Sequence, residues 1–143
     1  MRRPRAGRAG ATAAVLAAVV LAMAFRWGPL TTVPTARGAV TLVYVGAEDC
    51  APCRSWQSVD GAKFRTSPEF APIIYREVKS PTVRDVLNDD YWPDDLRGHR
   101  DRLGRGAGVP LWLVIADDEI IERAFGASQW HSTVLPKIKS LLR

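Results

Sequence analysis

Cys50 and Cys53 are the residues of this sequence whose type and spacing could do chemistry. They are the only cysteines in the 143-residue chain, and Ala51 and Pro52 separate them. Two thiols at this spacing can form a disulfide and pass it to another thiol through a mixed disulfide. The thiolate is the reactive species, and the N–H groups and dipole at a helix N-terminus stabilise it. We therefore expect Cys50 to begin a helix and act as the nucleophile, with Cys53 one turn inside and more shielded.

The cysteine pair could also serve three other purposes. A tetrahedral zinc site needs two further ligands, and His99 and His131 stand at no finger-like spacing from the cysteines. A purely structural disulfide is a weak explanation, because two intervening residues close too small a loop to constrain an unfolded chain. Soft thiolates suit Cu(I), although no His or Met lies near the motif in sequence. No metal is therefore expected, and copper delivery is kept as an alternative.

The residues around the motif predict the elements that position it. Residues 40–45 form a β-branched apolar run that suits a buried strand, which Gly46 ends. A helix follows the cysteines, with Trp56 and Val59 facing the sheet, and Gly61 ends or kinks it. Ser67 and the proline after it predict the start of a short helix.

The second half of the chain predicts the remaining elements. Strands are expected at residues 73–78, 111–116 and 119–125, the last two as an antiparallel hairpin, and helices at 93–103 and 128–142. His99 lies among charged residues and is interpreted as solvated, and His131 as a surface residue. The tryptophans at positions 56, 112 and 130 are interpreted as core residues.

The positive charge of the sequence is concentrated in its first 37 residues. The formal net charge is +5, but six arginines and no acidic residue precede Gly38, which leaves 14 Lys or Arg against 15 Asp or Glu in the rest. The remainder is nearly neutral, so no nucleic-acid binding is expected. Residues 9–25 carry no charge and follow four arginines, a pattern typical of a signal peptide or an N-terminal membrane anchor.

This leader divides the chain and predicts its location. Residues 1–25 are interpreted as the signal peptide or anchor, 26–39 as a linker and 40–143 as the folded domain. Cytoplasmic arginines place the rest across the membrane, where an oxidising compartment allows disulfides to form. We expect the bacterial periplasm, with the protein either tethered to the inner membrane by the N-terminal helix or released after cleavage.

The order of the expected elements, β-α-β-α-β-β-α with Cys-x-x-Cys after the first strand, resembles the thioredoxin-like family over residues 40–143. A second motif, Gly108-Val109-Pro110 before a buried strand and hairpin, is similar to the cis-proline segment of that family. The resemblance implies an α/β fold with a central mixed sheet flanked by helices, preceded here by the N-terminal hydrophobic helix. It also implies a cis Val109–Pro110 bond that lies beside Cys50 and offers backbone groups to a substrate.

The function implied by the resemblance is that of an exported thiol–disulfide oxidoreductase. Cys50, Cys53 and Pro110 would be catalytic, and Val109 and Pro110 would bind the substrate. No cofactor is implied. The partners would be protein thiols and disulfides, a redox partner that recycles the cysteines, and the membrane if the N-terminal segment is uncleaved. The alternative is a non-enzymatic thioredoxin-like module that binds a partner or delivers copper.

Two departures from the family bear on the direction of electron transfer. Tyr44 stands where thioredoxin has a buried acid that helps move protons to the second cysteine. Glu48 is the nearest substitute in sequence, and we favour a solvated surface charge for it. Val109 replaces the threonine that usually precedes the proline, and in this it is similar to the periplasmic oxidase branch.

Overall fold

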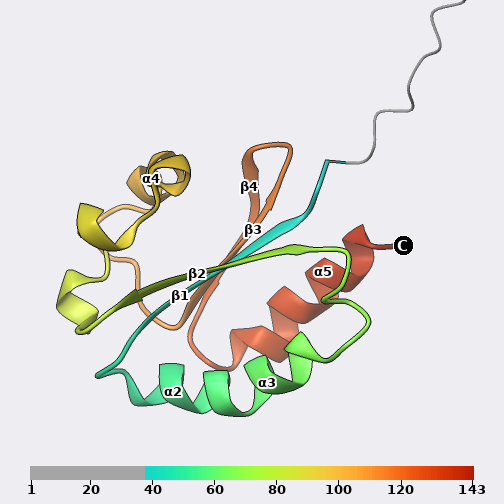
Figure 1. Ribbon diagram of the computed structural model, residues 1–143, viewed down its shortest axis with the longest axis horizontal. Coiled ribbons are helices and arrows are strands. Elements are labelled where there is room, and N and C mark those ends of the chain that lie inside the picture. Colours follow the sequence, from blue (N-terminus) through green and yellow to red (C-terminus); the bar gives the residue numbers. More distant parts are fainter. Residues whose placement is uncertain (1–37) are drawn as a thin grey trace, which may run out of the picture. The chain divides into compact units, whose positions relative to one another are not determined.

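The computed structural model describes residues 38–143, which contain one four-stranded mixed sheet in the order β2-β1-β3-β4 (Figure 1). Strand β1 (Thr41–Ala47) runs parallel to β2 (Ile74–Ser80) and antiparallel to β3 (Leu111–Ala116). Strand β4 (Glu119–Phe125) pairs antiparallel with β3. This confirms the expected mixed sheet. The expected hydrophobic helix and all but the last two residues of the expected linker lie outside the described residues.

The two inner strands are buried on both faces, which explains their continuous apolar sequences. In β1 the side chains of Leu42 and Tyr44 join one hydrophobic cluster, and those of Val43 and Val45 join another on the opposite face. The hairpin between β3 and β4 turns through Asp117 and an aspartate after it, with φ of 51° and 62°. Left-handed conformations at both turn residues match the twist of a tight two-residue hairpin.

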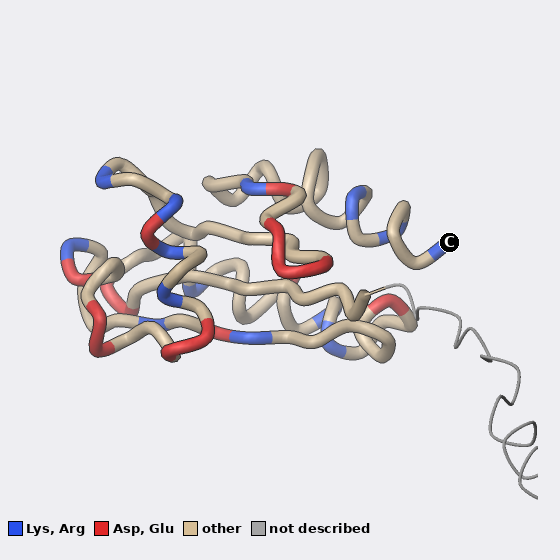
Figure 2. The backbone as a smooth tube through the Cα atoms, turned by 90° about the horizontal axis from the view of Figure 1, so that it is seen from above, with Lys and Arg blue, Asp and Glu red and all other residues tan. Residues whose placement is uncertain are grey.

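Helices cover both faces of the sheet (Figure 1). On one face lie α2 (Ala51–Ser58), α3 (Asp60–Arg65) and the C-terminal helix, which comprises a π-helical turn, η3 (Trp130–Val134), and α5 (Leu135–Leu141). On the other lie the short 3-10 turns η1 (Val83–Asp85) and η2 (Asp89–Tyr91) and the helix α4 (Asp94–Asp101). The expected core tryptophans at 56, 112 and 130 all lie in the first hydrophobic cluster, as predicted. Acidic and basic residues are interspersed along residues 38–143 (Figure 2).

Several local expectations around the first helix are wrong. Val59 was expected to face the sheet, but it is 47% exposed. Gly46 lies inside β1 and not at its end, since the strand continues to Ala47. The helix breaks at Val59, while Gly61 lies within α3. A Cβ at Gly61 would lie 3.0 Å from the Trp56 ring, so the glycine is explained by close packing and not by helix termination.

Another error concerns the helix expected from Ser67. Successive turns replace it, with Phe70 N–H bonded to the Ser67 carbonyl and Ile73 N–H bonded to the Phe70 carbonyl. Pro72 explains the difference, because it lacks an N–H and disfavours helical conformation at the residue before it. Only five residues separate Ser67 from Ile73, too few for a helix that must also reach β2.

The C-terminal helix was expected at residues 128–142 as one regular helix. It instead starts as the π-turn η3 and becomes α-helical at Leu135. Pro136 has no N–H to donate to the carbonyl one turn earlier, and a wider turn accommodates that missing bond. No helix within residues 38–143 is long and apolar enough to cross a membrane.

His99 was interpreted as solvated, and this is also wrong. Its side chain in α4 is only 5% exposed. The Nε2 atom lies 3.2 Å from Asp118 in the hairpin turn, and Nδ1 lies 2.7 Å from the Arg102 guanidinium. The charged sequence around His99 belongs to the solvent side of α4, and one helical period places the imidazole on its inner side. His131 is exposed, as predicted.

Candidate redox site

Cys50 and Cys53 form a disulfide at the N-terminus of α2, with an S–S distance of 2.05 Å. Cys50 is the N-cap residue, with extended backbone angles of −89° and 105°, so the prediction that it begins the helix is confirmed. Its Sγ atom lies 3.2 Å from the Cys53 backbone N–H, which donates to it. The sulfur of Cys50 therefore occupies the place where N-cap side chains accept hydrogen bonds and where the helix dipole favours negative charge.

The two cysteines differ in their access to solvent. Cys53 is fully buried in the first hydrophobic cluster, whereas Cys50 is 6% exposed and lies between the exposed Asp49 and Ala51. A reagent can reach the Cys50 side of the disulfide more readily. This agrees with the order of reactivity expected from sequence, although the roles of nucleophile and resolving thiol stay predictions.

The end of the sheet nearest Cys50 collects the other expected site residues. The Val109–Pro110 peptide bond is cis, as predicted. Leu111, which follows it, pairs with Val45, so the cis peptide lies beside the C-terminal end of β1, from which the chain leads to Cys50. The carbonyl of Pro110 accepts a hydrogen bond from Gly126 N–H at 2.8 Å. Val109 is half-buried and Pro110 is buried. Their catalytic and substrate-binding roles stay predictions.

Asp49 ties the cysteine motif to the segment that follows β2. Its carboxylate accepts a hydrogen bond of 2.8 Å from Val83 N–H, and its own N–H donates to the Pro81 carbonyl at 3.3 Å. Glu48 N–H also donates to the Ser80 carbonyl at 3.0 Å. Sequence reasoning missed this role of Asp49, because its partner lies 34 positions away in the sequence. The only local signal was an acidic residue directly before an N-cap.

The hydroxyl of Tyr44 contacts the backbone of Cys53. It donates to the Cys53 carbonyl at 3.3 Å and accepts from Gln57 Nε2 at 2.9 Å. The ring stacks on Trp56 with centroids 4.5 Å apart. Burial raises the pKa of Tyr44, and the hydrogen bond from Gln57 partly opposes that effect. A neutral Tyr–Gln pair therefore fills this position. Gln57, which the sequence did not single out, completes it.

Neither Glu48 nor either histidine forms a hydrogen bond with the side chains of Tyr44 and Gln57 within residues 38–143. The Glu48 side chain is exposed, as we favoured from sequence. His99 contacts Asp118, and His131 lies 3.1 Å from Asp60. Within residues 38–143 no three His, Cys, Asp or Glu side chains come together as a metal site.

The fold and the disulfide allow comparison with known proteins. No family model and no curated protein matches the sequence. Among solved structures, the short form of thioredoxin f from spinach chloroplast matches with a TM-score of 0.51 and 14% identity, over 75% of this chain and 80% of that chain. This chain has a thioredoxin-like fold. A complex of ferredoxin:thioredoxin reductase with thioredoxin f2 matches similarly, with a TM-score of 0.50 and 14% identity, over 75% of this chain and 81% of that one.

Proposed function

We propose that this chain is a thiol–disulfide oxidoreductase that acts on protein substrates. The observation that carries the proposal is the Cys50–Cys53 disulfide at a helix N-terminus, at the same end of the sheet as the cis Val109–Pro110 peptide. The thioredoxin-like fold of the chain supports it. Two adjacent sulfurs, one at the edge of solvent and one buried, suit an exchange in two steps.

The exchange balances with thiols and disulfides alone. In the reducing direction, the Cys50 thiolate attacks one sulfur of a substrate disulfide, forms a mixed disulfide and releases one substrate thiolate, which takes up a proton. Cys53 then loses its proton and attacks the Cys50 sulfur. The Cys50–Cys53 disulfide forms, the second substrate thiol leaves, and two electrons have passed to the substrate. A dithiol partner restores the reduced pair, and the same steps in reverse oxidise a substrate.

The surroundings of the two sulfurs support Cys50 as the attacking thiolate and Cys53 as the resolving thiol. The Cys53 N–H and the start of α2 favour negative charge at Cys50. Cys53 is buried beside the neutral Tyr44 hydroxyl, where a thiolate is disfavoured until the resolving step. The neighbouring Val109 and Pro110 would then bind the substrate segment that carries the disulfide.

The leader sequence supports an exported location for this activity. A positive start followed by an uncharged apolar segment favours a protein of the bacterial periplasm, tethered to the inner membrane or released from it. Folded proteins that need disulfides are found in that compartment. The substrates would be exported proteins with exposed thiols or disulfides, and a membrane-bound or soluble dithiol protein would recycle the pair.

Cysteine variants of the full chain test the proposal in the exporting cell. Cys53→Ser should accumulate mixed disulfides through Cys50, because no resolving thiol remains, and thiol-specific reduction should release the partners. Cys50→Ser should trap few partners, and the double variant none. Non-reducing gels of the affinity-purified variants show the difference. Equal trapping by the two single variants contradicts the assignment, and tight Cu(I) binding without disulfide reduction in an insulin assay favours the copper-delivery alternative.

A further inference from the structure

Phe125, the last residue of β4, is the most exposed large apolar residue of the described part of the chain, at 63%. It pairs with Leu111, which belongs to the second hydrophobic cluster. The alternation of side chains along a strand therefore places the Phe125 ring on the α4 face of the sheet, at its open edge. A single exposed apolar residue needs no partner, so the surroundings of the ring decide what it can do.

A cavity of about 250 Å³ lies against the Phe125 ring. We call it the Phe125 pocket. Leu103 and Leu111, both buried, line it together with the segment 106–108. A Cβ at Gly108 would lie 3.0 Å from the Phe125 ring, so the missing side chain lets the ring approach the backbone. A cavity of about 150 Å³ holds a benzene ring, and the Phe125 pocket therefore has room for one aromatic or large aliphatic side chain.

The Phe125 pocket adjoins the cis-proline segment. Gly108 and Leu111, which line the pocket, flank the Val109–Pro110 bond. Val109 packs against both hydrophobic clusters, so this segment passes between the two faces of the sheet. Strand β4 is the second strand from β1 in the sheet, at about 10 Å, and an extended chain advances about 3.3 Å per residue. A substrate segment bound at Cys50 therefore reaches the pocket with its third or fourth residue.

The charge beside the pocket is positive. Arg123 is the only ionisable residue of the described chain that lines the pocket, and its guanidinium donates to the Leu103 carbonyl at 3.1 Å. It forms no ion pair within residues 38–143. The neighbouring cavity, which shares these two residues, adds Arg102 and Glu119, so one positive charge remains. Glu122 lies on the other face of β4, since it pairs with a residue of the first cluster. Acidic residues of a bound segment are therefore favoured here over basic ones.

We propose that Phe125 determines the substrate specificity of the thiol–disulfide exchange. The Phe125 pocket holds an aromatic or large aliphatic side chain three or four positions from the substrate cysteine, in an acidic sequence. This inference rests on the proposed function and deepens it. The preferred substrates are unfolded or flexible segments, because an apolar side chain must leave its own core to enter the pocket. The bonds made and broken at Cys50 and Cys53 are those of the exchange described above.

The test uses three short peptides with a central cysteine, each joined to 5-thio-2-nitrobenzoate as a mixed disulfide. The first carries phenylalanine at the third and fourth positions on both sides of the cysteine and glutamate at both ends. The second has alanine in place of phenylalanine, and the third has lysine in place of glutamate. The full-length chain is reduced with dithiothreitol, which is then removed. Its Cys50 thiolate attacks the peptide sulfur and releases the coloured nitrothiobenzoate, whose absorbance gives the rate constant.

Each rate constant is divided by that of the same peptide with free dithiothreitol, which corrects for the reactivity of the peptide disulfide itself. The corrected value for the first peptide should exceed that of the alanine peptide roughly five- to tenfold, the range for burial of about half of a phenylalanine side chain. Lysine in place of glutamate should lower it by up to about fivefold, the range of an exposed charge pair. Salt at about 1 M should remove the effect of lysine and keep that of phenylalanine.

Phe125→Ala should remove most of the preference for phenylalanine, and Phe125→Tyr should keep it, because tyrosine retains the ring. Ile74→Ala is the control. Ile74 is 47% exposed and lies at the start of β2, at the end of the sheet opposite the disulfide. This variant should keep the preference.

Four results would each overturn the inference while the exchange itself stands. They are equal corrected rates for the phenylalanine and alanine peptides, equal rates for the glutamate and lysine peptides, an unchanged preference in Phe125→Ala, and loss of the preference in Ile74→Ala. A reduced chain that reacts with none of the three peptides would overturn the proposed function, and this inference with it.

Discussion

Substitution of Gly46 by alanine should destabilise the domain through the Tyr44 hydroxyl. A Cβ at Gly46 would overlap that oxygen and lie 2.8 Å from Cζ and 3.1 Å from Cε1 of the same ring. The ring cannot tilt away freely, because it stacks on Trp56 at 4.5 Å and is fully buried. Overpacking of a core side chain costs about 1–3 kcal/mol. The gain from replacing a glycine in a strand, roughly 0.5–1 kcal/mol, does not offset that cost.

A second substitution shows whether the hydroxyl is responsible. Tyr44→Phe removes the hydrogen bonds to the Cys53 carbonyl and from Gln57, at a net cost of about 0.5–1.5 kcal/mol for each. In the double variant the closest contact, between the added Cβ and the Tyr44 hydroxyl oxygen, no longer exists. The two changes should therefore not add. The double variant should be more stable than the sum of the single effects predicts, with a coupling of about 1 kcal/mol, within the range known for contacting residues.

Urea unfolding of the oxidised protein, followed by far-ultraviolet circular dichroism, measures these free energies. Gly98→Ala is the control. Gly98 lies in α4 with no atom within 4 Å of the added Cβ, so alanine should stabilise the domain by about 0.5–1 kcal/mol. Additivity of Gly46→Ala and Tyr44→Phe within about 0.5 kcal/mol, or an unchanged stability of Gly46→Ala, would refute the placement of the hydroxyl over Gly46.

Two further predictions follow. Removal of residues 1–37 should leave a folded domain with a cooperative unfolding transition, since both hydrophobic clusters lie within residues 38–143, and an unfolded product would contradict this. Arg76 binds Asp95 through two hydrogen bonds, of 2.8 and 3.2 Å, and lowers the pKa of that carboxyl. The stabilisation is present above the unfolded pKa of about 4 and is lost as the pH falls through the lower folded value. Asp95→Asn should therefore reduce stability near pH 7 more than at pH 2 in urea titrations, and an equal loss at both would refute the pair's contribution.

Elements with strong local signals could be predicted from the sequence. The β-branched run before Cys50, the apolar strand from Leu111 and the hairpin at Asp117 each carry their own pattern, and all three are present. The cis bond at Pro110 was implied by a resemblance and not by any local signal. The predicted elements were wrong where the residues of one segment allowed two local interpretations. Ser67 has the signature of a helix start, but Pro72 five residues later prevents the helix.

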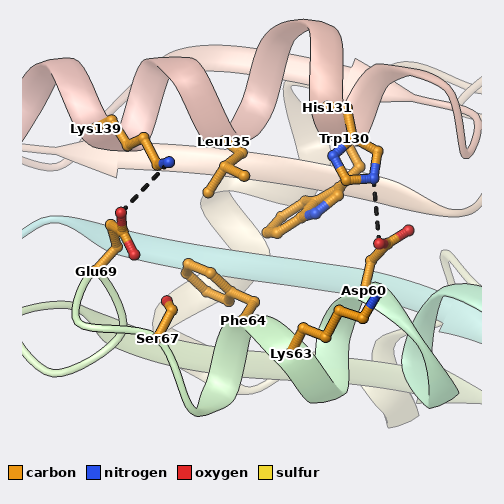
Figure 3. A pocket seen from close by; sticks show the side chains of 9 residues that line it. All are labelled: Asp60, Lys63, Phe64, Ser67, Glu69, Trp130, His131, Leu135 and Lys139. Atoms are coloured by element: carbon orange, nitrogen blue, oxygen red, sulfur yellow. Dashed lines mark hydrogen bonds and ion pairs between the residues drawn. The ribbon is translucent and has the colours of Figure 1, made fainter.

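Other features depend on partners far apart in the sequence and could not be predicted. His99 is buried because the β3–β4 hairpin brings Asp118 to its ring. The charges around His99 suggest solvent, whereas its spacing of three residues from the buried Leu96 places it on the inner side of α4. What periodicity within α4 could not indicate is that Asp118 packs against it. A cavity of about 220 Å³ between α3 and the C-terminal helix likewise combines Phe64 with Trp130, which are 66 positions apart (Figure 3). No spacing within either segment indicates that a cavity remains between them.

The neutral Tyr44 hydroxyl beside the Cys53 backbone bears on the second step of the proposed exchange. A carboxylate beside Cys53 could accept the proton of its thiol directly, whereas a neutral phenol with a raised pKa cannot do so near neutral pH. The Tyr44 hydroxyl can take up the proton of Cys53 only if it gives its own proton to another group at the same time. Gln57, half-buried and bonded to the hydroxyl at 2.9 Å, links Tyr44 toward the surface. In the proposed oxidoreductase, release of the Cys53 proton should therefore be slow, and mixed disulfides at Cys50 should be long-lived even when Cys53 is present.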